Sequence, residues 1–439
     1  MPAMKSFHII TFGCQMNEHD SERMTGILEA QGSTLVSDPG QAEMIILNTC
    51  SIREKAEQKF YSELGRLRQL KTENPNLKIA VAGCIAQQEG RKILSRAPYV
   101  DMIFGPSDIA KISDIVEAQR VRRNPVIDIE GDAEYHHKLV PTSRTDSLKA
   151  WVSIMYGCDN FCTYCIVPYL RGRERSRPPG DIVKEVHDLA EKGYKEVTLL
   201  GQNVNSYGKG LGTAVNFPEL LNRVNDVVGI ERIRFVTSHP KDLSDGLITA
   251  LSDLLKVCES IHLPAQSGSD RILAAMNRRY TAAAYLDKVK KLREAVPGIA
   301  LTTDIIVGFP GETEDDFSMT MKLLRDVSFD SIFAFKYSQR PNTVALELAR
   351  QVPEDVKEAR LAQALELQQD IALQKNKDLI GTVQEVLVEG PSKKGETLTG
   401  RTRGNKAVNF IGQASLRGSL AQVRIRSAAQ NSLSGEICG

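Results

Sequence analysis

Residues 156–165 read Tyr-Gly-Cys-Asp-Asn-Phe-Cys-Thr-Tyr-Cys and hold three of the chain's eight cysteines. Cys158, Cys162 and Cys165 have the spacing C-x3-C-x2-C. Thiols this close together, in a chain without secretory features, favour metal ligation over disulfide bonds. A structural zinc site needs four ligands, whereas three thiolates on a four-iron cluster leave one iron open to another molecule. The stretch therefore indicates a metal centre with an open coordination position, with structural zinc or an inert thiol cluster as the alternatives.

The composition is that of an ordinary globular protein. The chain has 439 residues, of which 41% are hydrophobic and 25% are charged, a size that suits about two to four domains. The net charge is only +1, so binding of a polyanion would require a local basic patch. The N-terminus lacks the apolar segment of a secretory signal, and no run approaches the roughly 18 apolar residues of a membrane span. We therefore expect a cytoplasmic protein without a membrane association.

A second set of cysteines follows three predicted strands near the N-terminus. The apolar runs cover residues 7–12, 44–49 and 78–82, and each precedes a helix-like polar stretch. This alternation predicts an open parallel α/β sheet. Cys14, Cys50 and Cys84 come directly after the three runs. Because parallel strands end at one edge of a sheet, these thiols can converge into a second metal site. Three buried thiols that act as small apolar residues are the alternative.

The middle of the chain predicts a partial barrel. Residues 110–149 are charged and contain Pro and Ser, which suggests a connector. Six strands separated by helices follow, and they predict a (β/α)6 partial TIM barrel with its functional loops where the strands end. The predicted strands cover residues 150–156, 195–200, 232–237, 260–263, 299–307 and 332–337. Polar or glycine-containing loops follow these strands, although each alone is equally typical of an ordinary turn.

The C-terminal part changes character after a long predicted helix over residues 354–377. Short alternating strands with glycines between them predict a small β-barrel. Residues 377–439 carry nine Lys or Arg against five acidic residues. A basic barrel suits nucleic acid, which it would hold through phosphate contacts. A solvated basic surface is the alternative.

Together these blocks resemble the methylthiotransferase branch of the radical S-adenosylmethionine (SAM) enzymes over nearly the whole chain. The sequences around Cys14, Cys50 and Cys84 resemble the tRNA 2-methylthio-N6-isopentenyladenosine synthases in particular. The resemblance implies three domains: an N-terminal methylthiotransferase domain (5–121), a radical SAM core (144–375) and an RNA-binding TRAM barrel (377–439).

The resemblance also implies the cofactors and the reaction. Cys158, Cys162 and Cys165 would bind the [4Fe-4S] cluster that cleaves SAM, while Cys14, Cys50 and Cys84 would bind an auxiliary [4Fe-4S] cluster. One SAM would donate a methyl group to sulfur, and a second would supply the radical that removes hydrogen from C2 of adenine. An aryl C–H bond offers no acidity to a side-chain base, so the cofactor must carry this step.

Further contacts are expected on the same grounds. The arginines at positions 171, 173, 175 and 177 would contact phosphate or the SAM carboxylate, unless they form a solvated loop paired with Glu174. His239 and His262 lie at strand ends, where a structural role is as reasonable as a ligand contact. Asn342 stands where this family often has Gly, and Asn tolerates positive φ better than most residues. The residues expected to bind SAM are Gly201, Gln202, Asn203, Ser238, Gln266, Asp304 and Arg171.

The implied partners are the anticodon stem-loop of tRNA, an electron donor such as flavodoxin or ferredoxin, and a sulfur carrier, and the chain is expected to be a monomer. The competing substrates are threonylcarbamoyladenosine in tRNA and a ribosomal protein. A function of a different class, a non-catalytic RNA-binding protein with a metal cluster, would give no 5′-deoxyadenosine from SAM.

Overall fold

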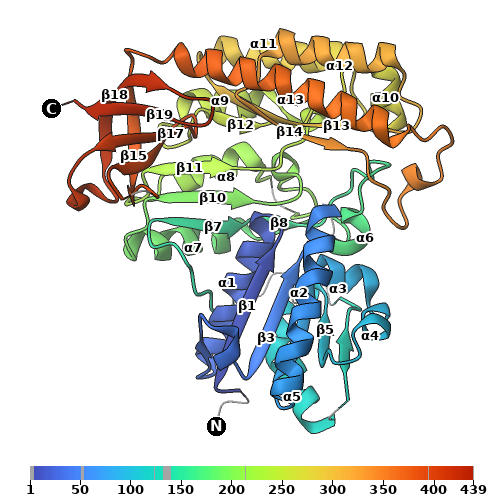
Figure 1. Ribbon diagram of the computed structural model, residues 1–439. Coiled ribbons are helices and arrows are strands. Elements are labelled where there is room, and N and C mark those ends of the chain that lie inside the picture. Colours follow the sequence, from blue (N-terminus) through green and yellow to red (C-terminus); the bar gives the residue numbers. More distant parts are fainter. Residues whose placement is uncertain are drawn as a thin grey trace. The chain divides into compact units, whose positions relative to one another are not determined.

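The computed structural model describes residues 4–50, 54–122, 124–131, 140–212, 214–393 and 395–438. The chain forms two compact units, whose elements Figure 1 colours along the sequence. The first unit comprises Met1–Ser147, Trp151–Asp159 and Ile166–Arg177, and the second comprises Leu148–Ala150, Asn160–Cys165 and Pro178–Gly439. No helix within the described ranges is long and apolar enough to cross a membrane.

The first unit is built on a parallel sheet with the strand order β2-β1-β3-β4-β5-β6. Its strands are β1 (Ser6–Phe12), β2 (Thr34–Leu35), β3 (Met44–Thr49), β4 (Lys78–Gly83), β5 (Met102–Phe104) and β6 (Val126–Asp128). The strand order reverses between β1 and β3. In open α/β sheets, such a switch point is where ligands bind, beyond the carboxyl ends of the strands.

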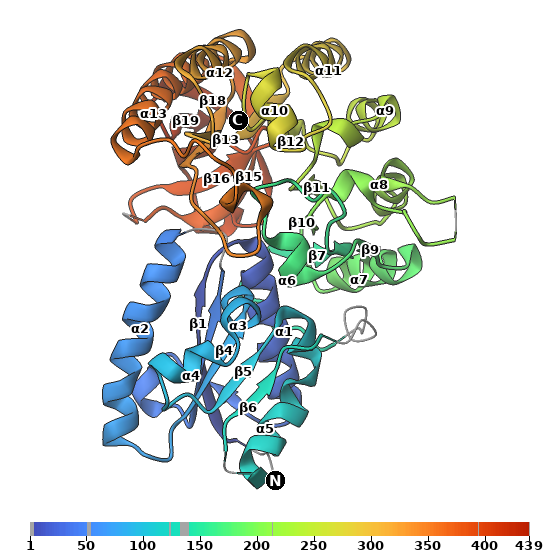
Figure 2. The ribbon, with the colours of Figure 1, turned by 90° about the vertical axis from the view of Figure 1, so that its right-hand side faces the viewer.

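Helices cover both faces of this sheet, with α1 and α5 on one face and α2, α3 and α4 on the other (Figure 2). They are α1 (Gln15–Ala30), α2 (Glu54–Glu73), α3 (Cys84–Glu89), α4 (Lys92–Arg96) and α5 (Ile112–Arg122). Successive residues of a strand point to opposite faces, so Ile45 packs on one side and Ile46 on the other. Burial on both faces explains why the strands read as continuous apolar runs.

The connector predicted over residues 110–149 is wrong in its first part. Ile112, Ile115 and Val116 have the spacing of a helix face and pack into the core of the sheet. β6 then pairs in parallel with β5. The charged residues that suggested a connector, such as Arg120, lie on the exposed side of α5. Residues 132–139 of the predicted connector lie outside the described residues.

The second unit contains the predicted barrel strands from residue 195 onward with their helices, whereas residues 151–156 of the first predicted strand belong to the first unit. Strands β10 (Glu196–Leu200) and β11 (Arg232–Phe235) form a sheet with β7 (Lys149–Ser153), and β12 (Ser260–His262), β13 (Ala300–Val307) and β14 (Ser331–Lys336) form another. A parallel bridge between Ile233 and Val257 joins β11 to the segment before β12. The helices are α7 (Pro179–Glu191), α8 (Phe217–Asn225), α9 (Asp245–Asp253), α10 (Asp270–Ala275), α11 (Ala282–Ala295), α12 (Glu314–Val327) and α13 (Glu354–Lys377). Figure 2 shows helices of this unit following one another along the outside of the strands.

The C-terminal strands close into the predicted small barrel, with the order β15-β16-β17-β19-β18. They are β15 (Val383–Pro391), β16 (Leu398–Thr402), β17 (Ala407–Ile411), β18 (Leu420–Ala428) and β19 (Leu433–Ile437). Alternate apolar residues, such as Val386 and Val388, fill its core. The alternating residues at 383–388, 398–402, 408–410 and 423–425 predict β15 to β18. The sequence pattern missed β19, because Leu433–Ile437 carries only two apolar residues.

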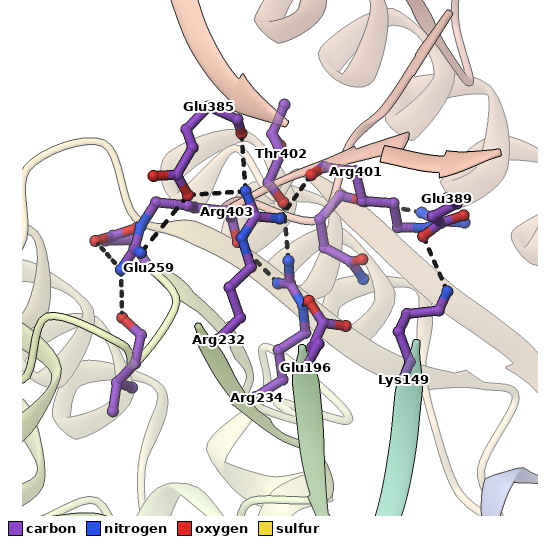
Figure 3. Close-up of polar contacts among 12 residues, drawn as sticks. Lys149, Glu196, Arg232, Arg234, Glu259, Glu385, Glu389, Arg401, Thr402 and Arg403 are labelled. Atoms are coloured by element: carbon purple, nitrogen blue, oxygen red, sulfur yellow. Dashed lines mark hydrogen bonds and ion pairs between the residues drawn. The ribbon is translucent and has the colours of Figure 1, made fainter. Parts of the chain in front are cut away.

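Two arginines of β11 attach this small barrel to the larger one (Figure 3). Arg232 is fully buried, and its guanidinium donates to the backbone oxygens of Arg401 (2.7 Å) and Glu385 (3.0 Å) and to the Glu385 carboxylate (2.9 Å). Arg234 donates to the backbone oxygens of Arg403 and Thr402, both at 2.8 Å. The small barrel is therefore held mainly through its backbone.

The small barrel also donates hydrogen bonds to the larger barrel. The guanidinium of Arg403 donates to both carboxylate oxygens of Glu259, at 2.6 and 2.8 Å, and to the backbone oxygen of Val257 at 2.8 Å. Lys149 and Glu389 add an ion pair of 2.9 Å (Figure 3). Donors from both barrels thus cross this contact.

We predict that Arg232→Ala destabilises the second unit. The substitution removes the guanidinium donor from the backbone oxygens of Arg401 and Glu385, and charge-assisted hydrogen bonds of this kind contribute about 1.5–3 kcal/mol each. The free energy of unfolding should fall by about 3 kcal/mol in denaturant titrations. Arg223→Ala is the matched control, because Arg223 forms an exposed i,i+4 ion pair with Glu219 at 3.0 Å; its loss should cost less than about 1 kcal/mol. Equal effects of the two substitutions would contradict the prediction.

Candidate functional site

The first thiol group lies at the carboxyl edge of the parallel sheet. Cys14 caps the start of α1, Cys50 follows β3, and Cys84 is the first residue of α3 directly after β4. Cys50 and Cys84 are buried, whereas Cys14 is half-buried. None of the eight cysteines forms a disulfide in the described part of the chain. The structure therefore brings the three predicted ligands to the same edge, beside the switch point between β1 and β3.

Two buried asparagines hold the loops of Cys14 and Cys50 together. The side-chain oxygen of Asn17 accepts a hydrogen bond from the Cys14 sulfur at 3.3 Å, and its amide nitrogen donates to the backbone oxygen of Thr49 at 3.2 Å. The amide nitrogen of Asn48 donates in return to the backbone oxygen of Asn17 at 2.7 Å. Sequence reasoning missed both residues, although a polar Asn48 inside a buried strand was a usable signal.

Glycines allow the close approach of these loops. Gly83 has a φ of +86°, and a Cβ there would lie 2.5 Å from the side-chain oxygen of Asn48 and 2.6 Å from the backbone oxygen of Thr49. A Cβ on Gly13 would lie 2.6 Å from the Cβ of Cys50. A larger residue at either position would therefore force the strand ends apart.

A buried arginine adds positive charge to the first thiol group. Arg171 ends α6 (Val167–Arg171) and pairs with Asp20 at 3.0 Å. It also hydrogen-bonds the sulfur of Cys84. A hydrogen bond from Cys50, together with the charge of Arg171, lowers the pKa of Cys14 to about 6 despite its burial. Burial raises the pKa of Cys84. The lowered pKa makes it easier for Cys14 to lose its proton, as it must do to bind a metal.

The other arginines of this run have different environments. Arg173 is exposed and pairs with Asp159 at 2.7 Å, while Arg177 is buried and donates to the backbone oxygen of Ser153. Arg173 thus has a carboxylate partner in Asp159. A pocket of about 180 Å³ lies here in the first unit. Its lining includes Tyr156, Tyr169, Arg171, Arg173 and Arg175.

The second thiol group is the cysteine loop of residues 156–165. Cys158 belongs to the first unit, where its N–H donates to the backbone oxygen of Gly172 at 3.2 Å. Cys162 and Cys165 belong to the second unit, and the N–H of Cys165 donates to the backbone oxygen of Cys162 at 2.9 Å. Arg278 donates to the Cys162 sulfur at 3.4 Å, a contact that sequence reasoning missed.

Polar atoms without partners gather at strand ends of the second unit. The side-chain oxygens of Asn203, Ser238 and Gln266 are buried and have no hydrogen-bond partner among the described residues. These residues follow β10, β11 and β12. Buried polar atoms cost free energy unless they form hydrogen bonds, so the three residues suit a polar ligand. Gly201 and Gln202 lie in the loop of Asn203.

The remaining strand-end residues have partners within the protein. Asp304 lies in β13, and its carboxylate is 3.4 Å from the Nε2 of His262, whose Nδ1 is 2.9 Å from the Thr302 hydroxyl. The Nδ1 of His239 accepts the N–H of Lys241 at 3.2 Å. Burial and the charge of Arg278 hold the pKa of His239 far below its usual range. The neutral ring of His239 therefore carries its proton on Nε2, a buried donor with no acceptor in the described structure.

The backbone at Asn342 confirms one further expectation. Asn342 adopts a φ of +63°, the conformation for which glycine is usually chosen. Asn342 therefore adopts the backbone conformation that Gly would adopt at this position.

Comparison with known proteins shows the family. Residues 6–105 match the "Uncharacterized protein family UPF0004", residues 152–324 the Radical SAM superfamily, and residues 377–438 the TRAM domain. The chain is 52% identical over 433 residues to the tRNA-2-methylthio-N(6)-dimethylallyladenosine synthase of Thermodesulfovibrio yellowstonii, and covers 99% of both chains. The chain belongs to this synthase family. A synthase of the same name from Clostridium perfringens is 52% identical over 436 residues, covering 99% of this chain and 98% of the other.

Members of the synthase family are radical SAM enzymes, which implies SAM and a [4Fe-4S] cluster as cofactors. Solved structures share the fold. The radical SAM methyltransferase TsrM from Kitasatospora setae has a TM-score of 0.56 at 12% identity, covering 87% of this chain and 78% of its own. The cobalamin-dependent radical SAM enzyme OxsB has a TM-score of 0.52 at 13% identity, covering 84% and 56%.

We predict that the metal-free chain has an unusually acidic thiol at Cys14. The rate of Cys14 alkylation should rise as the pH increases through about 6 and then level off, because the thiolate is the reactive form. In Cys50→Ala the inflection should move to higher pH, because the hydrogen bond to the Cys14 sulfur is lost. Peptide mass spectrometry after iodoacetamide pulses measures both rates. Buried Cys258, whose pKa is raised by burial, should stay unmodified; an inflection of Cys14 near 9 would contradict the prediction.

A second prediction concerns Gly83. Gly83→Ala should lower the free energy of unfolding by about 2 kcal/mol or more, because it adds a strained φ and a backbone clash. Gly65→Ala is the control, since nothing lies within 4 Å of a Cβ at Gly65. Gly65→Ala should leave the free energy of unfolding unchanged or raise it. Thermal melts of both variants and the parent chain measure the two effects.

Proposed function

We propose that the chain adds a methylthio group to C2 of N6-isopentenyladenosine beside the anticodon of tRNA. The observation that carries this proposal is 52% identity over 99% of both chains to a relative named for this product. The three matched ranges fall along the chain in the order expected for such an enzyme. The division into domains 5–121, 144–375 and 377–439 belongs to the same proposal.

Cys158, Cys162 and Cys165 would hold the [4Fe-4S] cluster that cleaves SAM, with Gly201, Gln202, Asn203, Ser238, Gln266 and Asp304 around the SAM molecule. The unpartnered oxygens of Asn203, Ser238 and Gln266 support this assignment. The cluster and SAM together would supply both a methyl group and a radical that abstracts hydrogen. The protein's own part is to present hydrogen-bonding atoms at fixed positions and to exclude water.

Cys14, Cys50 and Cys84 would hold a second [4Fe-4S] cluster, the source of the transferred sulfur. The convergence of three thiols, the acidic Cys14 and the buried Arg171 support an anionic metal centre there. The expected contact of Arg171 with SAM remains a prediction. Its bonds to Asp20 and Cys84 give more support to a role at the second cluster.

The tRNA anticodon stem-loop would be held by the basic TRAM barrel and by Arg173 and Arg175, which line a pocket with two tyrosines. Arginine and tyrosine suit phosphate and unstacked bases. A flavodoxin or ferredoxin as electron donor, a sulfur carrier, a monomeric state and a cytoplasmic location complete the proposal.

The test is a reaction with anaerobically reconstituted protein, SAM, dithionite and tRNA that carries N6-isopentenyladenosine. We expect 5′-deoxyadenosine and a methylthio-modified nucleoside, both measured by mass spectrometry. Cys158→Ala should abolish both products, whereas Cys84→Ala should retain SAM cleavage and lose methylthio transfer. Cys258→Ala, which changes a buried thiol outside both groups, should retain both.

Other outcomes would redirect the proposal. If the methylthio group were added to threonylcarbamoyladenosine in tRNA, or to a ribosomal protein, and not to N6-isopentenyladenosine, that molecule would be the substrate. A cluster-loaded protein that binds tRNA but forms no 5′-deoxyadenosine would indicate a non-catalytic RNA-binding protein.

A further inference from the structure

Arg278 is a buried cation without a carboxylate partner. Only 4% of its surface is exposed. Within the described residues it forms no ion pair with Asp or Glu, and its guanidinium contacts two oxygens, one ring and one sulfur. Burying an unpaired charge is costly, so buried arginines normally face an anion. The guanidinium of Arg278 faces the sulfur of Cys162, one of the three cysteines assigned to the cluster.

The guanidinium is fixed in its orientation by three donors. Its Nη1 donates to the Cys162 sulfur at 3.4 Å, its Nη2 to the backbone oxygen of Pro264 at 2.7 Å, and its Nε to the Tyr280 hydroxyl at 3.0 Å. The Tyr280 hydroxyl donates onward to the backbone oxygen of Ala265, 2.9 Å away. Because each edge of the guanidinium is occupied, rotation away from the sulfur would break several bonds.

The backbone around Arg278 is shaped to reach the cysteine loop. Asn277 and Arg279 have φ values of +59° and +58°, a conformation that costs free energy in residues other than glycine. The side-chain nitrogen of Asn277 donates to the backbone oxygens of Asn160 and Phe161, at 3.2 and 3.0 Å. The Thr163 hydroxyl donates to the backbone oxygen of Ala275 at 2.9 Å. The end of α10 and the segment after it are therefore hydrogen-bonded to the cysteine loop on both sides of Cys162.

We propose that Arg278 is a positioning residue whose hydrogen bond and charge at the Cys162 sulfur raise the reduction potential of the cluster bound there. The inference rests on the proposed cluster at Cys158, Cys162 and Cys165. Reduction adds one negative charge to the cluster, and hydrogen bonds to its sulfurs together with nearby positive charge stabilise the reduced state. Arg278 supplies both to one ligand. It thereby eases the electron transfer that must precede reductive cleavage of SAM.

The test measures the potential directly. The full chain carrying Cys14→Ala, Cys50→Ala and Cys84→Ala would be reconstituted anaerobically, so that one cluster is observed in redox titrations followed by electron paramagnetic resonance. Adding Arg278→Gln should lower the ratio of reduced to oxidised cluster at least tenfold at a fixed potential, a shift of about 59 mV for one electron. Arg278→Lys, which keeps the charge but loses the fork of donors, should give a smaller shift in the same direction.

Arg279→Gln is the matched control. It removes the same charge from the neighbouring exposed residue and should leave the ratio within about twofold, because screened charges act weakly. If Arg278→Gln takes up no cluster, Tyr280→Phe is measured in its place, because this change removes the oxygen that orients Nε of Arg278. Tyr280→Phe should lower the ratio of reduced to oxidised cluster. A potential equal to that of the parent would overturn the proposal.

The outcomes separate this proposal from the proposed function. A parent chain that binds no cluster would overturn both. A cluster whose potential is equal in Arg278→Gln and Arg279→Gln would overturn the role of Arg278 alone. An unchanged potential with a raised KM for SAM would instead make Arg278 a SAM-binding residue.

Discussion

Parallel pairing of β1, β3 and β4 is the constraint on which the first thiol group depends. The register places Phe12 beside Thr49 and Thr49 beside Gly83, so the residues that follow must leave the sheet at one edge. The shared edge of the sheet thereby makes neighbours of cysteines that are far apart in the sequence. The sheet brings the cysteine loops close together, and the hydrogen bonds of Asn17 and Asn48 and the glycines Gly13 and Gly83 then allow their close contact.

Much of this arrangement could be predicted from the sequence. Continuous apolar runs define strands buried on both faces, and a cysteine after each run marks the shared edge. The long helix α13 was predicted with its observed bounds, because no Gly or Pro interrupts residues 354–377. The failures have a common physical origin. The charged face of α5 was mistaken for a connector, since local composition does not show which side of a helix is covered.

The contacts missed by sequence reasoning join residues that are distant along the chain. Asp20 and Arg171 are 151 positions apart, and Cys162 and Arg278 are 116 apart. Nothing near Arg278 in the sequence marks it as buried, because it stands next to an exposed arginine of the same type. Only the tertiary fold distinguishes them. In both thiol groups a buried guanidinium faces sulfur, so each unit places a positive charge beside its buried cysteines.

The attachment of the small barrel has a consequence for how its surface can change. Arg232 and Arg234 recognise mainly backbone oxygens of β15, β16 and the turn after β16. A backbone oxygen is present whichever side chain its residue carries. Side chains of those strands that do not contact the larger barrel can therefore be replaced during evolution without loss of these backbone contacts. The surface of the small barrel can therefore change in evolution to suit a polyanionic partner, while the backbone contacts that attach it to the larger barrel are kept.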